Sequence, residues 1–263
     1  MQPQTLLAAD EPAAVQVEQA QGRSPFFLTC DHAGALVPRQ LNALGLSAGD
    51  LQRHIAWDIG AAAVSRKLAA RLDAFLILQT YSRLVIDCNR PPGSAQSIVA
   101  VSEATRIPGN EAVSSFEALA REREVFRPYH DRLRAELEQR DAQGRLTVLI
   151  AMHSFTPVFH GNQRPWQVGL LYNRDRGLAQ ALLRVLRRDA DLVVGDNEPY
   201  SVSDATDYTI PVYAERRGLL HVGIELRQDL IADEHGQEQW AVRLAEALPT
   251  AVAEVQREDS AGV

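Results

Sequence analysis

Short apolar runs alternate with longer amphipathic stretches along most of this 263-residue chain. The runs have the length and the β-branched or aromatic content of strands, at positions 26–28, 75–78, 84–86, 146–152, 168–172, 192–194 and 219–226. The stretches between them repeat apolar residues at helical spacing, over 50–72, 114–140, 178–186 and 238–255. Strands that alternate with helices predict an α/β fold in which a mostly parallel sheet is covered by helices on both faces.

The two ends of the chain lack this pattern. Residues 1–24 are rich in Ala, Gln and Glu without strong periodicity, so we expect a loosely ordered N-terminal arm. Residues 25–257 are expected to form a single α/β domain, followed by a short tail at 258–263. Within the domain, the stretch 89–113 contains several prolines and glycines and predicts a long irregular segment of the kind that acts as a lid.

Composition excludes several classes of protein. The formal charge of -7 offers no basic field for a phosphate backbone, so we expect no nucleic-acid partner. No stretch approaches the ~18 apolar residues of a transmembrane span, and the N-terminus lacks the basic start and apolar centre of a signal peptide. Cys30 and Cys88 each end an apolar run and are typical of buried thiols in a reducing compartment. We therefore expect a cytoplasmic monomer or homodimer that binds no membrane.

Two histidines stand at the ends of apolar runs. His32 closes the segment 26–32, and His153 directly follows the run 146–152. The crevice beyond the carboxyl ends of parallel strands is where ligands bind in open α/β sheets. Either histidine alone also fits a core or capping position. A metal of the zinc type takes imidazole and carboxylate ligands, with three protein ligands in catalytic sites, so this pair still requires one carboxylate.

Two segments offer that carboxylate. The predicted helix 50–72 is preceded by a sequence of capping-box form and places His54 and Asp58 at i and i+4, on one face. A simpler interpretation is that these two residues pair with each other on the helix surface. Asp31 adjoins His32 and is either a ligand itself or an outer partner that fixes the tautomer of the imidazole.

Arginine and amide side chains surround the apolar run 84–86. Arg83 precedes it, and Asn89 and Arg90 follow it. A guanidinium beside an amide offers a bidentate fork for a substrate carboxylate. A structural salt bridge between Arg90 and Asp87 is the alternative.

Glu225 lies inside the last apolar run. A carboxylate is rare at such a position unless it is paired or catalytic. Arg227, two residues further along, is its simplest partner.

Six segments, read in this order, resemble the N-formylglutamate amidohydrolase family. They are Asp31-His32-Ala-Gly34, Trp57-Asp58-Ile-Gly60, Ser82-Arg83-Leu-Val-Ile-Asp87-Cys-Asn89-Arg90, Met152-His153-Ser154-Phe155, Asn197-Glu198-Pro199-Tyr200-Ser201 and Ile224-Glu225-Leu-Arg227-Gln-Asp229-Leu230. The order of histidine, carboxylate, Asn-Arg, histidine and glutamate is also that of the zinc carboxypeptidase and aminoacylase group. The resemblance implies a three-layer α/β/α fold, phosphorylase/hydrolase-like, with a mononuclear zinc site.

The resemblance also implies the roles of individual residues. It implies a zinc-dependent hydrolase that cleaves the amide bond of a small N-acyl amino acid, N-formyl-L-glutamate, in amino-acid catabolism, with histidine degradation suggested by the family name. Cobalt or manganese is an alternative to zinc. The expected metal ligands are His32, Asp58 and His153, the acid–base residue is Glu225, and the substrate-binding residues are Asn89, Arg90, Arg83 and Arg227. Outer partners are expected at Asp31, His54, Ser154 and Asn197.

One position departs from the carboxypeptidase pattern. That group pairs its first histidine with a glutamate three residues later, where this chain has Ala35. We therefore assign the second ligand to Asp58, with Asp31 or His54 as replacements. The alternatives to the main hypothesis are a related zinc hydrolase for another N-acylglutamate or a small peptide, and a non-catalytic carboxylate-binding protein with the same fold.

Overall fold

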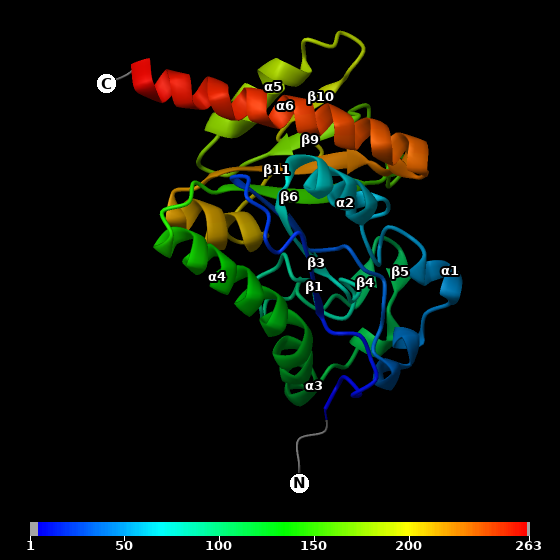
Figure 1. Cartoon of the computed structure of the whole chain (residues 1–263). Coiled ribbons are helices and arrows are strands. Elements are labelled where there is room, and N and C mark those ends of the chain that lie inside the picture. The colour runs from blue at the N-terminus through cyan, green and yellow to red at the C-terminus, as the bar shows by residue number, and fades with distance from the viewer. Residues whose placement is uncertain (1–4, 262–263) are drawn as a thin grey trace.

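The computed structural model describes residues 5–261 of the chain (Figure 1). The strands of its main sheet are β1 (Val15–Glu18), β2 (Phe26–Cys30), β3 (Phe75–Gln79), β6 (Val148–Phe155), β9 (Val168–Leu171), β10 (Val194–Asp196) and β11 (Leu220–Arg227). Two small hairpins are formed by β4 (Val101–Ser102) with β5 (Thr105–Arg106) and by β7 (Val158–Phe159) with β8 (Asn162–Gln163). The α-helices are α1 (Ala48–Leu51), α2 (Ala61–Leu72), α3 (Ser115–Arg121), α4 (Arg127–Ala142), α5 (Gly177–Leu186) and α6 (Glu234–Ala261).

The main sheet is mixed, with a parallel centre. Within the described residues its strand order is β1-β3-β2-β6-β11-β9-β10. Strands β3, β2, β6 and β11 are parallel to one another, whereas β1 and β9 pair antiparallel at the two sides of this group. All residues of β2, β3 and β6 are buried, which explains why these strands are continuous apolar runs in the sequence.

Helices cover both faces of the sheet (Figure 1). On one face α6 packs against α2 and α5, and their apolar residues form one core cluster with alternate residues of the strands. On the other face α4 and the short helix η4 (Ile210–Ala214) contribute to a second cluster. The π-helical turn η3 (Glu122–Phe126) joins α3 to α4. The predicted α/β fold with a mostly parallel sheet between two helical layers is confirmed.

Most predicted elements are present within a few residues of their expected bounds. Ser114 and Glu117 form a capping box at the start of α3, where the helical pattern over 114–140 begins. Strand β6 is longer than expected and includes His153, so this histidine lies within the strand rather than after it.

The predicted continuous helix 50–72 is wrong. Helix α1 ends at Leu51 and α2 begins at Ala61, so His54 and Asp58 share no helix face. Gly60 stands directly before α2, and its φ of +79° belongs to the left-handed region, so the helix cannot extend back through it. A Cβ on Gly60 would also lie 2.4 Å from the carbonyl oxygen of Ile231, so the chain fits here only without a side chain.

The predicted strand over 84–86 is also wrong. Leu84, Val85 and Ile86 form part of a turn and a coil, and their side chains join the second core cluster. The run is apolar because it is buried, and burial alone does not specify a strand.

The two ends differ from the expected arm and tail. Residues 15–18, within the predicted loose arm, form the edge strand β1, which pairs with β3. Helix α6 continues past position 257 to Ala261. The assignment of 25–257 to one domain stays a prediction.

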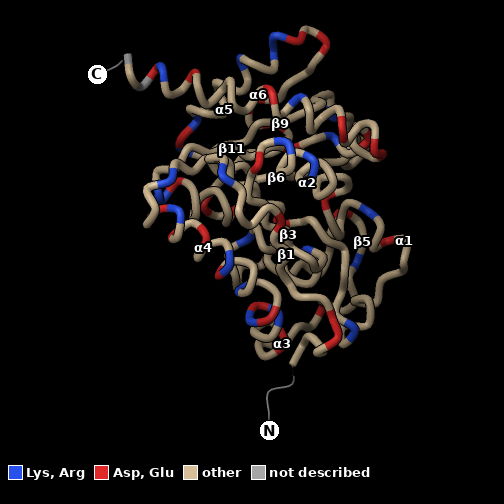
Figure 2. Tube along the Cα trace, in the orientation of Figure 1, with Lys and Arg blue, Asp and Glu red and all other residues tan. Residues whose placement is uncertain are grey.

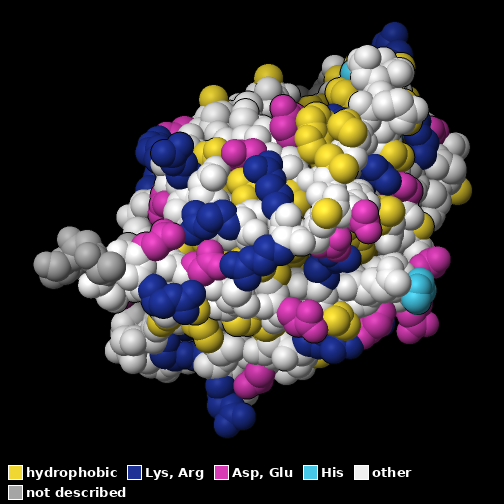
Figure 3. All heavy atoms as spheres, turned by 90° about the horizontal axis from the view of Figure 1, so that it is seen from above, with side chains coloured by type: hydrophobic (Ala, Val, Ile, Leu, Met, Phe, Trp, Pro, Cys, Tyr) yellow, Lys and Arg dark blue, Asp and Glu magenta, His cyan; other side chains and the backbone are white. Residues whose placement is uncertain are grey.

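Charged residues are distributed along the whole trace, and both signs occur together (Figure 2). The face seen from above likewise mixes Lys and Arg with Asp and Glu and shows scattered hydrophobic side chains (Figure 3). Among the helices of the described part of the chain, none has the length and apolar character required to cross a bilayer.

Candidate active site

Neighbouring strands bring two histidines and a glutamate to one edge of the sheet. His32 follows directly after β2, whereas His153 and Glu225 lie near the ends of β6 and β11. Because β6 and β11 are parallel and in register, Glu225 is paired with His153. The rings of His32 and His153 are 5.0 Å apart between centroids. The sequence prediction that these strand ends converge is therefore confirmed.

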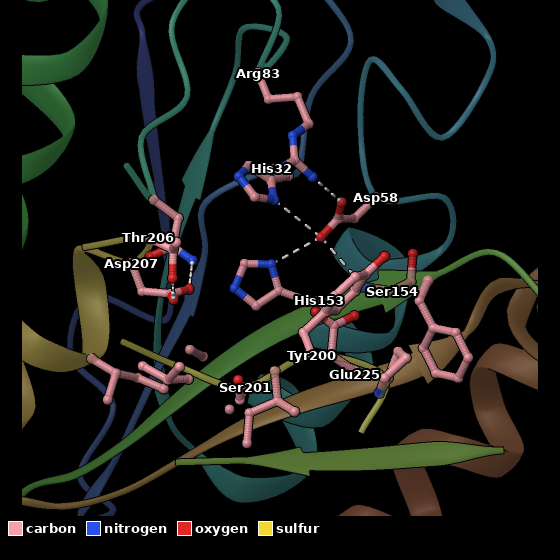
Figure 4. A pocket seen from close by; sticks show the side chains of 18 of the residues that line it. His32, Asp58, Arg83, His153, Ser154, Tyr200, Ser201, Thr206, Asp207 and Glu225 are labelled. Carbon is pink, nitrogen blue, oxygen red and sulfur yellow. Dashed lines mark hydrogen bonds and ion pairs between the residues drawn. The ribbon is translucent and has the colours of Figure 1, made fainter. Parts of the chain in front are cut away.

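Asp58 reaches the histidines from the segment between α1 and α2. Its backbone N–H donates to the carbonyl oxygen of His32 at 3.0 Å, which fixes the segment against the end of β2. Its Oδ2 lies 3.2 Å from Nδ1 of His32 and 2.9 Å from Nδ1 of His153 (Figure 4). One potential ligand atom from each of these three residues lies within 4.8 Å of the others. This is the triad expected from the sequence, although a broken helix delivers its carboxylate.

A carboxylate lies behind each imidazole. Oδ1 of Asp87 is 2.7 Å from Nε2 of His32. Oδ2 of Asp31 lies 3.8 Å from Nε2 of His153 and accepts a hydrogen bond from the hydroxyl of Thr209. Metal-binding histidines commonly direct their second nitrogen at a carboxylate, which orients the ring and fixes its tautomer. Both histidines therefore present Nδ1 to the site.

The sequence predicts no role for Asp87 at this site. Arg90 is its expected partner, but Arg83 pairs with it instead, through Nε at 3.1 Å and Nη2 at 2.7 Å. Arg83 and Asp87 are only four residues apart, and this proximity is the signal that the sequence offers for their pair. Asp31, expected beside the imidazole of His32, lies near His153 instead, and its role as an outer partner stays a prediction.

Charge pairing shifts the pKa of each member of the triad. Burial opposes ionisation of Asp58, but the two imidazoles outweigh it and hold the pKa of this carboxyl well below its usual range. Burial would lower the pKa of His153, yet the hydrogen bond and charge of Asp58 raise it to about 9. Burial and Arg83 act against protonation of His32, and the carboxylates of Asp87 and Asp58 prevail, so its pKa is raised. The carboxylates around the two imidazoles therefore favour a positive charge at this position.

Glu225 differs from the other carboxylates of the site in its contacts and in its pKa. It is buried, and its Oε2 has no hydrogen-bond partner among the described residues. Burial raises its pKa to about 7, with the nearby His153 acting in the opposite direction. Its simplest predicted partner, Arg227, binds Asp229 instead, with Nε at 2.8 Å from Oδ1. A buried carboxyl whose pKa lies near neutrality has the properties of a general acid–base group.

These residues line a cavity of about 510 Å³. Arg83 and Glu225 lie on opposite sides of the Asp58–His153 contact in the close view (Figure 4). Arg90 also lines the cavity, where its Nη1 lies 3.6 Å from Oδ1 of Asp207. The size falls within the range of about 300–1,000 Å³ that is typical of small-molecule sites.

Asn89 lines the cavity but has structural contacts. Its Oδ1 accepts hydrogen bonds from the backbone N–H groups of Tyr208 and Thr209, and its Nδ2 donates to Asp207. Asn89 thereby fixes the segment 207–209 against the turn that carries Arg90. Its expected contact with a substrate stays a prediction.

The remaining predicted residues occupy several positions. Ser154 lines the cavity and donates its backbone N–H to Asp58 at 3.3 Å. His54 also lines it, but Nε2 lies 3.0 Å from Glu103 rather than beside Asp58. Asn197 and Arg227 are not among the lining residues, and Oδ1 of Asn197 accepts the backbone N–H of Tyr172.

Residues of irregular segments complete the wall and were not predicted individually. Tyr200, Thr206, Asp207 and Gln96 lie on loops that come close to the sheet edge only in the folded chain. The phenol of Tyr200 accepts a hydrogen bond from Arg164 at 2.9 Å. Tyr200 belongs to the segment 197–201 that carries the family resemblance. Thr206, Asp207 and Gln96 lie in no quoted segment, and polar residues of loops carry no periodic signal.

The donor set fits a divalent metal. Two imidazole nitrogens and one carboxylate oxygen are a usual set for a catalytic zinc, which leaves a coordination position for water. The partnerless oxygen of buried Glu225 beside this set is consistent with a missing polar partner such as that water.

Comparison with known proteins identifies the family. A model of the N-formylglutamate amidohydrolase family matches residues 24–232. The gene product Atu2144 from Agrobacterium tumefaciens has a similar structure, with 41% identity and a TM-score of 0.92 over 95% of this chain and 99% of that chain. The N-formylglutamate amidohydrolase from Ralstonia eutropha JMP134 shares the fold at 18% identity, with a TM-score of 0.71 over 94% of this chain and 100% of that chain. A search of the curated proteins found no match. The matched segment contains the whole triad and Glu225, and the chain belongs to the N-formylglutamate amidohydrolase family.

Proposed function

We propose that this protein is a metal-dependent amidohydrolase that cleaves small N-acyl amino acids, with N-formyl-L-glutamate as the substrate that the family name suggests. The observation that carries the proposal is the His32–Asp58–His153 cluster beside the buried, partnerless carboxylate of Glu225. This combination supplies both a cation site and an acid–base group within one cavity.

His32, Asp58 and His153 would hold the metal. A divalent cation, when bound, supplies a water whose pKa falls from ~15.7 towards ~7 and polarises the carbonyl of the amide. Zinc is the cation that we propose, with cobalt or manganese as alternatives for the same ligands. Asp87 and Asp31 would orient the two imidazoles through their Nε2 atoms.

Glu225 would act as the acid–base group of the reaction. It accepts a proton from the water that attacks the carbonyl carbon, and it gives this proton to the amide nitrogen as the C–N bond breaks. The products are a carboxylate, formate in the N-formyl case, and the free amino acid. Proton transfer by a positioned group contributes ~10² to 10⁴ in rate.

Arg90 would bind the carboxylate of the amino acid. Its guanidinium borders the cavity, and its recorded partners are the carbonyl oxygen of Asn89 and the more distant Asp207. Arg83 donates hydrogen bonds to Asp87 and borders the same cavity. Holding the carboxylate orients the scissile bond and does not itself break it. We further propose that the protein works in the cytoplasm as a monomer or homodimer in amino-acid catabolism.

The first experiment measures metal content and turnover of purified protein and of His153→Ala. We expect a stoichiometric divalent metal in the parent protein and loss of both metal and activity in the variant. His235→Ala, at an exposed histidine of α6, is the control and should keep both. Full metal and activity in His153→Ala would rule out the proposed site.

Glu225→Gln separates catalysis from metal binding. We expect this variant to retain the metal and to lose turnover by at least ~10²-fold, because an amide cannot accept the proton. Retained turnover would remove the acid–base assignment. Ligand binding without hydrolysis in the metal-replete parent protein would instead favour a non-catalytic carboxylate-binding protein.

A further inference from the structure

Arg164 is a buried arginine whose charge no carboxylate of the described residues neutralises. The residue is 9% exposed, and its Nη1 donates a hydrogen bond to the phenol oxygen of Tyr200 at 2.9 Å. Among the described residues, no Asp or Glu forms an ion pair with it. A buried guanidinium usually has an anion as its partner, because burial removes the water that would solvate the charge. Arg164 therefore lacks the partner that its charge requires.

Aromatic rings hold this guanidinium in place. Its Cζ lies 4.4 Å from the ring centroid of Phe159, 4.8 Å from that of Tyr200 and 5.8 Å from that of Phe155. The backbone N–H of Arg164 donates to the carbonyl oxygen of Pro157 at 2.8 Å, next to the hairpin β7–β8. Rings contact the faces of a guanidinium and leave the N–H groups of its edge for a carboxylate in the same plane. The fold therefore fixes the position of the charge without neutralising it.

Two of these rings belong to the wall of the active-site cavity. Tyr200 and Phe155 both line it, and the close view shows Tyr200 among the side chains of the site (Figure 4). Phe155 follows His153 by two residues in β6, so it lies on the same face of the sheet, about 7 Å further along the strand. This separation is comparable to that between the amide group and the side-chain carboxylate of N-formyl-L-glutamate.

The phenol of Tyr200 connects the buried charge with the cavity. A tyrosine hydroxyl is both an acceptor and a donor, and it keeps its proton at neutral pH. Its oxygen accepts the hydrogen bond from Arg164, and its O–H has no acceptor among the described residues. The O–H is therefore available to a ligand in the cavity, and the guanidinium behind it stabilises negative charge on that ligand.

The other arginines at the cavity have different partners. Arg83 donates to Asp87 at 2.7 Å, and Arg90, which lies 3.6 Å from Asp207, is the residue proposed to bind the α-carboxylate. A substrate with a second carboxylate requires a second cationic group, since an unpaired charge is costly to bring into a cavity. Arg164, behind the cavity wall, meets this requirement.

We propose that Tyr200 and Arg164 form the subsite for the side-chain carboxylate of an N-acyl glutamate, while Arg90 binds its α-carboxylate. Tyr200 donates its hydroxyl hydrogen to the side-chain carboxylate, and Arg164 positions the phenol and supplies the compensating charge. This inference rests on the proposed amidohydrolase function and assigns the residues that select its substrate. The reaction and the acid–base role of Glu225 are unchanged.

The test compares N-formyl-L-glutamate with N-formyl-L-glutamine, whose side chains have the same shape but different charge. We expect kcat/KM of the metal-replete enzyme to be at least about tenfold higher for the glutamate derivative. Arg164→Gln should lower this ratio by about tenfold or more, mainly through a higher KM for the glutamate derivative. Equal values for both derivatives in the parent protein, or an unchanged ratio in Arg164→Gln, would overturn the inference and leave the proposed function intact.

A second variant tests the phenol, and the ratio does not depend on how much of a variant is folded. Tyr200→Phe keeps the ring under Arg164 but removes the donor, and should lower the ratio by about fivefold or more. Arg243→Gln is the matched control, because this guanidinium also lies over a ring, 5.6 Å from the centroid of Trp240, and is not among the residues that line the cavity. It should leave the ratio at the parent value. An unchanged ratio in Tyr200→Phe would remove the phenol from the subsite.

Failure of the proposed function remains distinguishable from failure of this inference. If the metal-replete enzyme hydrolyses neither derivative, the proposed function fails. Calorimetric titration of both derivatives into Glu225→Gln protein, with and without Arg164→Gln, then decides the subsite. Tighter binding of the glutamate derivative that is lost with Arg164→Gln supports it. Equal binding of the two derivatives, no binding of either, or a preference that survives Arg164→Gln contradicts it.

Discussion

At the scale of single residues, the position of Asp87 explains how the imidazole of His32 is oriented. Asp87 accepts hydrogen bonds from Arg83 and from the backbone N–H of Asn89, and its Oδ1 faces Nε2 of His32. These contacts and burial leave the carboxylate few other orientations. Burial disfavours its charge, but Arg83 and His32 more than compensate and keep the pKa of Asp87 well below its usual range. Asp87 is therefore charged wherever the enzyme would operate.

Replacing Asp87 tests this role. Asp87→Asn keeps the size of the side chain but removes the charge that orients the imidazole of His32. We expect the affinity for zinc to fall by about 10- to 100-fold, as is usual when such an outer carboxylate is removed. The measurement is competition with a chelator of known affinity. Asp229→Asn, at an acid that pairs with Arg227 outside the cavity, is the control. Equal zinc affinities for both variants would contradict the role.

The sequence predicted the residues at strand ends better than those on loops. His32, His153 and Glu225 each interrupt or end an apolar run, and parallel strands bring such positions together. Asp58 lies beside both histidines as expected, although the continuous helix predicted to carry it is absent. The resemblance to a family pointed to Asp58, whereas the helical periodicity did not. Asp87 was missed as a partner of His32, since no local pattern links residues so far apart in the chain.

At the scale of elements, Gly60 separates the segment that carries Asp58 from helix α2. Its left-handed backbone ends the turn after Trp57, and its close approach to Ile231 seats the start of α2 against the segment before α6. The helical periodicity over 50–72 continues through this point, so the pattern of apolar residues conceals the break. The apolar pattern therefore indicates that helix is present in this stretch, but it does not show that the helix begins only after Gly60.

Two glycine variants separate backbone strain from close packing. Gly60→Ala should destabilise the fold by more than about 2 kcal/mol, because it adds a strained φ and a Cβ that meets the carbonyl of Ile231. Gly93→Ala has a similar φ of +81° with no atom within 4 Å of its Cβ, and should cost only about 1 kcal/mol. Urea unfolding measures both free energies, and metal content should fall in Gly60→Ala alone. Equal stability losses would contradict the role assigned to packing at Gly60.

At the scale of the whole molecule, an aromatic cluster behind the cavity joins the second helical layer to the cavity wall. His130 of α4 lies with its ring centroid 4.1 Å from that of Phe126, 4.8 Å from that of Tyr208 and 5.5 Å from that of Tyr213. Its Nε2 lies 2.8 Å from the carbonyl oxygen of Cys88, to which the neutral ring can donate. Tyr208 follows Asp207 of the cavity wall, so the cluster supports the wall from outside.

Protonation of His130 should weaken the whole fold in acid. Burial lowers its pKa to about 4 from the usual 6.5, so the folded chain resists a proton that the unfolded chain accepts. Above pH 6.5 the ring is neutral in both the folded and the unfolded chain, and the fold has its full stability. As the pH falls from 6.5 towards 4, the unfolded chain takes up a proton that the folded chain does not, and the free energy of unfolding decreases. Between pH 7.5 and 4.5, the free energy of unfolding of the parent protein, measured in urea, should fall by on the order of 2 kcal/mol more than that of His130→Gln. His235→Gln, at an exposed histidine, should behave as the parent does, and an acid response shared by all three proteins would refute the assignment to His130.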